Sequence, residues 1–111
     1  RIVDVRGFLK KYRCNPNEKG VRIAIEVTDS FLEWNNAKLT VLFKKGKCKI
    51  CDDDIARYHV RMSVATLTAL LLGYKSAKQL FRAERIEGDL DAVRRLDDVL
   101  LHESPYISDY I

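Results

Sequence analysis

Apolar and polar residues alternate along four stretches of the chain, a pattern typical of strands with one buried face. The clearest stretch covers residues 21–28, where every second position is apolar: Val21, Ile23, Ile25 and Val27. A side-chain period of two predicts a strand. Residues 38–43, 47–51 and 58–62 show the same period, and Lys44-Lys45-Gly46 fits a tight turn. The sequence therefore predicts about four strands, the second and third forming a hairpin.

Helical spacing is found on both sides of these strands. Asp4 is the expected N-cap of a first helix, which ends before the Pro16 loop. Ser63 or Thr66, Ser76 and Asp89 are the expected caps of later helices over residues 64–72, 77–85 and 90–101. The last of these carries one apolar stripe, made by Leu90, Val93, Leu96, Val99 and Leu100. Strands grouped apart from helices predict an α+β domain, with an antiparallel sheet of about four to five strands and helices on one face.

Length and composition favour a single folded domain over residues 1–111. The 47% content of hydrophobic residues is ordinary for a globular chain and is sufficient for a core without disulfides. The chain begins Arg1-Ile2, and its only methionine is Met62. We therefore expect it to be a piece of a larger protein. Three cysteines and no secretory signal predict a cytoplasmic location.

Positive charge is concentrated in the first half of the chain. Residues 1–51 contain 12 Lys and Arg against 5 Asp and Glu, whereas residues 52–111 contain 8 against 11. The basic half could attract an acidic partner. Nucleic acid is not expected, because the lysines at 44, 45, 47 and 49 have only Phe43 near them as an aromatic neighbour. The longest apolar run, residues 67–72, is too short to span a membrane, and no membrane partner is expected.

The residues that could carry chemistry do not form a recognisable site. Cys48 and Cys51 form a C-x-x-C, but residues three apart on a strand point to opposite faces, and a zinc site needs four ligands. Asp52-Asp53-Asp54 lacks the spacing of a calcium loop. His59 and His102 are the candidate general bases, and neither has a nucleophile in a recognisable context. The sequence predicts no metal site.

No glycine-rich turn for a phosphate group is present. The glycines stand at positions 7, 20, 46, 73 and 88, never two within a short turn. A nucleotide cofactor needs such a turn at a helix N-terminus. We therefore expect no cofactor in this chain and no complete active site of its own.

Several segments together resemble the C-terminal domain of the Eis-type (enhanced intracellular survival) acetyltransferases. These segments are Arg1 to Val5 with Phe8-Leu9, the loop from Asp29 to Asn36 with its Trp-Asn-Asn, the Leu67–Ala77 segment with its Gly-Tyr turn, and Pro105 to Tyr110. The resemblance covers nearly the whole chain. It implies a sterol-carrier-protein type 2-like fold that follows two GCN5-related N-acetyltransferase domains, the second degenerate, in a bacterial enzyme. That enzyme would transfer acetyl from acetyl-CoA, held in its first domain, to an aminoglycoside or polyamine-like amine.

The resemblance also implies a role for the end of the chain. In the family, the terminal carboxylate enters the acetyltransferase active site, where it can act as a base or anchor the amine. Here that residue is Ile111, with Asp109 and Tyr110 as supports, although the family end is usually aromatic. Trp34 is expected to line a substrate or interdomain contact, with a core position as the alternative. The implied partners are the acetyltransferase domains of the same chain and further copies in a homo-oligomer.

A lipid- or sterol-binding module is the alternative function. The same fold carries apolar ligands between its sheet and its helices. The late helices and the loop around Trp34 supply many apolar residues for such a role.

Overall fold

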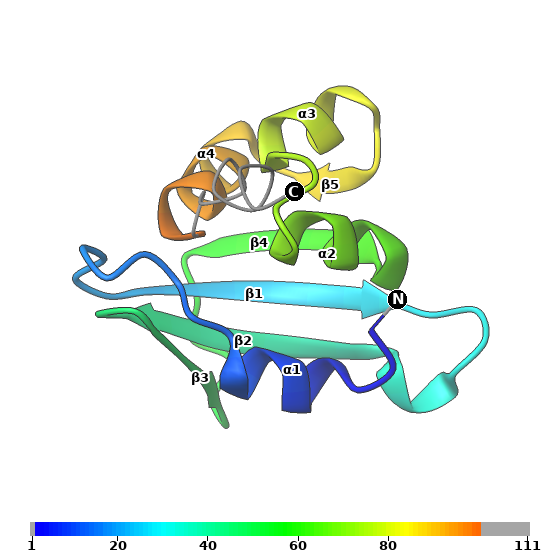
Figure 1. Ribbon diagram of the computed structural model, residues 1–111, viewed down its shortest axis with the longest axis horizontal. Helices are drawn as coiled ribbons and strands as arrows, with labels where there is room; N and C mark the ends of the chain where they lie inside the picture. Colours follow the sequence, from blue (N-terminus) through cyan, green and yellow to red (C-terminus); the bar gives the residue numbers. More distant parts are fainter. Residues whose placement is uncertain (1, 101–111) are drawn as a thin grey trace, which may run out of the picture.

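The computed structural model describes residues 2–100, which form one five-stranded sheet and four α-helices (Figure 1). In chain order, the elements are α1 (Val5–Lys11), β1 (Val21–Thr28), the 3-10 turn η1 (Glu33–Asn35), β2 (Ala37–Lys44), β3 (Lys47–Cys51), β4 (Tyr58–Ser63), α2 (Val64–Leu71), α3 (Ala77–Arg82), β5 (Ile86–Gly88) and α4 (Leu90–Val99).

The sheet is mixed, which corrects the prediction of an antiparallel sheet. Its order is β3-β2-β1-β4-β5. β1 is antiparallel to β2 but parallel to β4, with Ile23 opposite Tyr58. Strand direction cannot be read from a period-two pattern, because the alternation of buried and exposed residues is the same either way. The direction depends on residues 52–57, which return the chain to the end of the sheet where β1 begins, and in which Asp53 contacts Arg22 at 3.5 Å.

The predicted hairpin is confirmed, with a shorter turn. Lys44 pairs with Lys47, so only Lys45 and Gly46 make the turn. Their φ angles of 49° and 83° are both left-handed. Two left-handed residues form the turn whose twist matches that of paired strands.

Side-chain caps begin the first helices, as expected. Asp4 accepts a hydrogen bond from the Gly7 amide at 3.1 Å, and Ser63 accepts one from the Thr66 amide at 3.2 Å. Ser76 starts α3 with a reciprocal pair of bonds to Gln79. Asp89 precedes α4 without such a bond. These bonds satisfy amides of the first turn that have no partner inside the helix.

The third helix is shorter than predicted, because Glu84 adopts a left-handed φ of 60°. The amide of Arg85 donates back to the Leu80 carbonyl at 2.8 Å, which closes the helix end. No glycine marks this position, so the pattern did not reveal it. Residues 86–88, which follow this helix end, form β5, a strand that was not predicted. Leu90 was also misplaced: it is 45% exposed and lies outside the buried stripe of α4.

One face of the sheet carries the core. Side chains from β1, β2 and β4 form a single buried cluster with side chains from all four helices; its members include Leu9, Ile25, Val41, Met62, Leu67, Leu80 and Leu96. In Figure 1, α1 lies along β2 and β3, and the other helices gather beside β4 and β5. The α+β class is thus confirmed. The opposite face carries charged residues such as Glu26 and Arg61, which contact at 3.3 Å.

Candidate functional site

The loop between β1 and β2 is held rigid by one buried carboxylate. Asp29 is 5% exposed and follows directly after β1. Its Oδ1 accepts hydrogen bonds from the amides of Phe31 and Leu32 at 2.9 and 3.0 Å. Its Oδ2 accepts from Asn35 Nδ2 at 3.1 Å. The loop that contains the Trp-Asn-Asn run therefore has a defined shape, because both carboxylate oxygens bind loop atoms.

Asn35 joins this loop to the start of α1. Its Oδ1 accepts a bond from the Val5 amide at 3.1 Å, and its Nδ2 also donates to the Ile2 carbonyl at 3.3 Å. The Val5 amide opens α1 and has no partner inside the helix. Trp34 adds a bond from Nε1 to the Val3 carbonyl at 3.0 Å. Asn36 closes the loop on itself by bonds to both backbone groups of Asp29, at 2.8 and 2.9 Å.

The fixed loop presents large apolar side chains to solvent. Phe31 is 80% exposed and Trp34 is 70% exposed; Val3 beside Trp34 is 61% exposed, and Leu72 is 41% exposed. We call these four residues the apolar end. Its backbone is anchored by buried polar bonds, so the exposure does not come from a loose loop. Trp34 is bonded to Val3, Val3 and Leu72 line one groove, and Phe31 extends from the same loop as Trp34.

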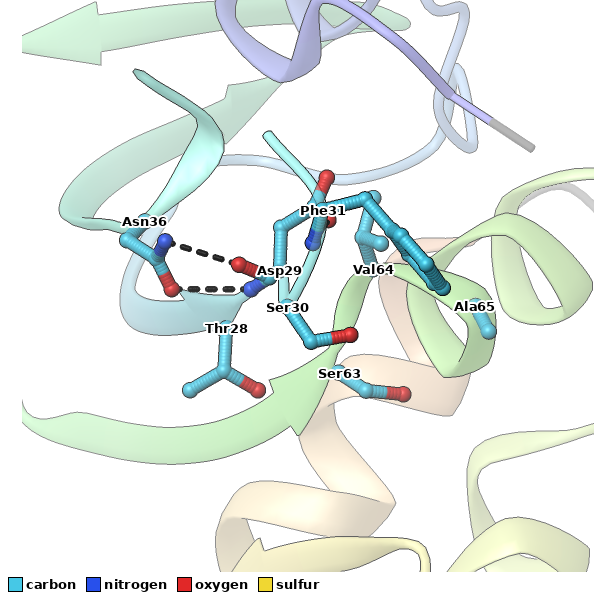
Figure 2. Close-up of a pocket in the computed structure, with 8 residues that line it drawn as sticks. All are labelled: Thr28, Asp29, Ser30, Phe31, Asn36, Ser63, Val64 and Ala65. Atoms are coloured by element: carbon cyan, nitrogen blue, oxygen red, sulfur yellow. Dashed lines mark hydrogen bonds between the residues drawn. The ribbon is translucent and has the colours of Figure 1, made fainter. Parts of the chain in front are cut away.

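A pocket of about 450 Å³ opens beside Phe31 (Figure 2). It lies where the parallel strands β1 and β4 end, so Thr28 and Ser63 line it from neighbouring strands. Figure 2 shows the Phe31 ring directed toward Val64 and Ala65 at the start of α2. Hydroxyl groups and one aromatic ring suit binding by hydrogen bonds and apolar contact.

The same pocket is poorly equipped for catalysis. Ser63 Oγ donates to Thr66 Oγ1 at 3.1 Å and accepts from the Thr66 amide, so it acts as a helix cap. Asp29 already accepts three hydrogen bonds from its own loop. Among the eight residues that line the pocket, no serine is paired with a histidine or lysine base.

A second groove, of about 430 Å³, runs between α1 and α2. Ile2, Val3, Phe8 and Leu72 give it apolar walls. The Ile2 amide donates to Thr68 Oγ1 at 3.1 Å, which ties the start of the chain to α2. The groove shares Val3 and Leu72 with the apolar end, so the two features adjoin at these residues.

The structure does not place the predicted catalytic residue. Ile111, its supports Asp109 and Tyr110, and the candidate base His102 all lie outside the described residues. His59 is exposed on β4. Trp34 is the predicted site residue whose surroundings are described. It is 70% exposed, so the alternative of a core position is wrong, and the contact role stays a prediction.

The C-x-x-C splits across the sheet, as its spacing predicted. Cys48 is 8% exposed on the core side, and Cys51 is partly exposed. The fold instead brings Cys48 against Cys14, a contact that the sequence did not indicate. Burial raises the pKa of Cys48 to about 12, and the neighbouring Cys14 adds to that rise. Within residues 2–100, no three His, Cys, Asp or Glu side chains gather as metal ligands.

An ion pair that spans the chain was also missed. Arg95 of α4 donates from both terminal nitrogens to Glu18, at 2.6 and 2.8 Å. This bond lowers the pKa of Glu18, which is 8% exposed, and raises the pKa of Arg95. The two residues are 77 positions apart, and no local pattern links them. The pair fastens the loop before β1 to α4.

Among residues 2–100, none of the helices has the length and apolar character that a membrane span requires.

Comparison with known proteins shows which family this domain resembles. Residues 5–108 match the family model of a sterol carrier protein domain. No curated protein matches the chain. A structure from Enterococcus faecalis V583, described as a conserved protein of unknown function and probable N-acyltransferase, is 31% identical over 91% of this chain and 25% of its own length, with a TM-score of 0.82.

Two further structures share the fold of this chain. Eis1 from Mycobacterium abscessus is 26% identical over 89% of this chain and 24% of its own, with a TM-score of 0.71. Sterol carrier protein-2 like-3 from Aedes aegypti shares the fold at 9% identity, over 76% of this chain and 81% of its own, with a TM-score of 0.52. The chain thus spans about a quarter of the length of the Enterococcus protein and of Eis1.

Proposed function

The chain belongs to the sterol carrier protein domain family, and we propose that it serves as the non-catalytic C-terminal domain of a GCN5-related N-acetyltransferase. The observation that carries this proposal is the 31% identity to a probable N-acyltransferase, of which this chain matches only 25%. Eis1, at 26% identity, supports the same reading. Acetyl-CoA would bind in the rest of such an enzyme, and the acceptor would be an aminoglycoside or polyamine-like amine.

The apolar end is the surface by which this domain would contact the remainder of the enzyme. In the isolated domain, most of the surface of the Phe31 and Trp34 side chains is exposed to water, at 80% and 70%. The bonds of Asp29 and Asn35 hold their loop in place before any partner binds. A preorganised loop binds more tightly because less conformational freedom is lost on contact. Assembly of the enzyme, including a homo-oligomer, would rest on this surface.

The terminal carboxylate of Ile111 is the proposed contribution to chemistry, supported by Asp109 and Tyr110. A main-chain carboxylate can accept hydrogen bonds from an ammonium group and can remove a proton from it. The basis for this assignment is the resemblance of the segment from Pro105 to Tyr110 to the end of the Eis-type chain.

The test is acetyl transfer by the full-length protein, with and without residues 109–111. We expect the truncation to abolish turnover while acetyl-CoA binding persists. A matched control replaces Ile111 with Val, which keeps the terminal carboxylate and both of its supports. If the truncated enzyme turns over at the normal rate, the carboxylate has no catalytic role. If the full-length protein binds no acetyl-CoA, the acetyltransferase assignment is itself wrong.

Lipid binding is the second candidate, favoured by the apolar walls of the groove between α1 and α2. The interior between sheet and helices offers less support, because Ile25, Leu67 and Leu96 fill it with exposures of 1% or less. Native mass spectrometry after addition of fatty acids and sterols tests this function. A bound lipid that is lost in the Phe8→Gln variant would support it, and absence of any adduct would reject it.

A further inference from the structure

The β2–β3 turn and the loop before β1 place three cationic residues at neighbouring positions of paired chains. Lys44 and Lys47 are partners across the hairpin, and Arg13 is bridged to Lys47 on its other side. We call Arg13, Lys47 and Lys44 the basic row. Paired chains lie about 4.8 Å apart in a sheet, so the three side chains start from neighbouring positions. Like charges that face each other across paired strands destabilise a sheet.

None of the ion pairs within residues 2–100 includes a member of this row. They involve Arg22, Arg61 and Arg95 instead. Glu18 is the acid nearest in the chain to Arg13, and Arg95 already holds both of its oxygens. Exposed Lys19 and Lys45 add further positive charge. The positive charge therefore results from how the strands pair, which sets Arg13, Lys47 and Lys44 side by side, and not only from the number of basic residues.

Besides the like-charge pair Lys44–Lys47, the turn has a lysine in a backbone conformation that lysine rarely adopts. Lys45 stands at φ 49°, a left-handed position where asparagine or glycine is favoured. Chains depart from local rules chiefly where function requires it. We propose that the basic row binds an acidic polypeptide segment, whose Asp or Glu carboxylates accept hydrogen bonds from Arg13, Lys47 and Lys44. This inference is independent of the acetyltransferase assignment.

The charges around the row favour a narrow partner over a wide anionic surface. Asp52 and Asp54 are exposed, and Asp53 contacts Arg22, which is paired with Leu42, two residues before Lys44. A lipid bilayer or a nucleic-acid duplex would face these aspartates as well as the cations. An extended acidic segment can follow the row and avoid them. Phe43, the aromatic residue next to Lys44, is fully buried and offers no ring for base stacking.

The position of the row leaves it accessible when the apolar end is occupied. In Figure 1, the loop before β1 and the β2–β3 turn project together from one end of the sheet, and the loop between β1 and β2 lies at the other. An acidic partner could therefore bind a domain that is already assembled into a larger protein.

The experiment measures fluorescence anisotropy of a labelled peptide of alternating Glu and Ser with the 111-residue chain, at low and at physiological ionic strength. We expect binding that weakens with salt and falls at least about tenfold when Lys44→Glu and Lys47→Glu are combined. The matched control combines Lys75→Glu and Lys78→Glu, two exposed lysines in α3 and just before it, which changes net charge equally. It is expected to retain binding within about twofold.

Several results would overturn the proposal. The control could lose as much binding as the row variant, or the row variant could bind normally. Phosphatidylserine vesicles or duplex DNA could bind more tightly than the peptide, which would assign the row to a different partner. A separate test needs no ligand: Lys44→Glu alone creates an opposite-charge pair with Lys47, so the melting temperature should rise by about 2–5 °C. An unchanged or lower value would show that the row is not repulsive.

Discussion

At the scale of single residues, Asn35 joins the loop between β1 and β2 to the start of α1. Its amide contacts the Val5 amide, the Ile2 carbonyl and the Asp29 carboxylate, and it is 3% exposed. Asn35→Ala removes the side-chain partner of the Val5 amide and of the Ile2 carbonyl, and it removes one of the hydrogen bonds to the Asp29 carboxylate. We expect the free energy of unfolding to fall by about 2–4 kcal/mol, since each unpaired buried polar group costs about 1–3 kcal/mol.

Urea denaturation of the two proteins measures this loss. Asn17→Ala is the control, because Asn17 is exposed and only its backbone amide makes a hydrogen bond. The control should stay within about 0.5 kcal/mol of the unaltered protein. Equal stability of the Asn35→Ala variant would mean that the loop is not anchored through this side chain.

The Trp-Asn-Asn run shows what sequence could predict at this scale. Its distinctive composition drew attention to the loop, and Trp34 was expected at a contact surface. The separate tasks of its members were not foreseeable: Asn35 binds the start of α1, Asn36 binds Asp29, and Trp34 binds Val3. Each of these bonds depends on where the start of the chain lies in space.

Buried Cys48 makes alkaline pH destabilising. Its pKa rises from 9.0 to about 12 on folding, so the folded state favours the neutral thiol. The resulting stability is fully present below pH 9 and is lost as pH rises from about 9 to 12. We expect Cys48→Ala to lower stability at pH 7 but to show a shallower decline above pH 9, as measured by thermal unfolding across pH.

The control for this decline is Cys51→Ala on the other side of β3. It should keep the steep alkaline slope of the unaltered protein. A parallel decline in the Cys48 variant would show that other groups cause the alkaline loss.

At the scale of elements, the Glu18–Arg95 pair is the link between the loop before β1 and α4. Folding lowers the pKa of Glu18, so this contribution is present above the unfolded value of 4.5 and is lost as pH falls below it. Arg95→Ala leaves a buried carboxylate without its partner. We expect a loss of about 2–4 kcal/mol at pH 7, less than for a fully buried pair because Arg95 is 28% exposed.

The pH dependence of the same variant gives a second readout. Without Arg95, burial penalises the carboxylate, so the variant should gain stability on mild acidification, where the unaltered protein loses it. Arg94→Ala, on the exposed side of α4, should behave like the unaltered protein. If both variants lose stability together on acidification, the pair does not control the acid response.

Element boundaries followed local signals where such signals existed. Asp4, Ser63 and Ser76 marked their helices correctly, because a cap acts within its own turn. The end of α3 was missed because a non-glycine residue, Glu84, takes the left-handed position. The short strand β5 exists because it can pair with β4, from Met62 to Val60. Such pairing is decided by the rest of the sheet.

At the scale of the whole molecule, the apolar end predicts association of the isolated chain. Phe31 and Trp34 expose large rings on one hydrogen-bonded loop, and Val3 lies beside Trp34. We expect concentration-dependent self-association in sedimentation velocity, because such surfaces bury themselves when their natural partner is absent. Phe31→Gln should reduce association without lowering stability, since Phe31 is mostly exposed.

The control for this surface is Tyr74→Gln, which removes a ring that is 75% exposed just after α2 and is not part of the apolar end. It should associate like the unaltered chain. A fully monomeric unaltered chain would argue against the apolar end as a docking surface.

The sequence by itself determined the α+β class, the hairpin, the caps of the first three helices and the split of the two C-x-x-C cysteines, because each follows from interactions within a few residues. Only the tertiary structure decided that β1 and β4 run parallel, that Asn35 reaches the first turn of α1, that Arg95 finds Glu18, and that Arg13, Lys47 and Lys44 stand in one row. These contacts join distant positions, and their energies arise from burial and register that no local pattern encodes.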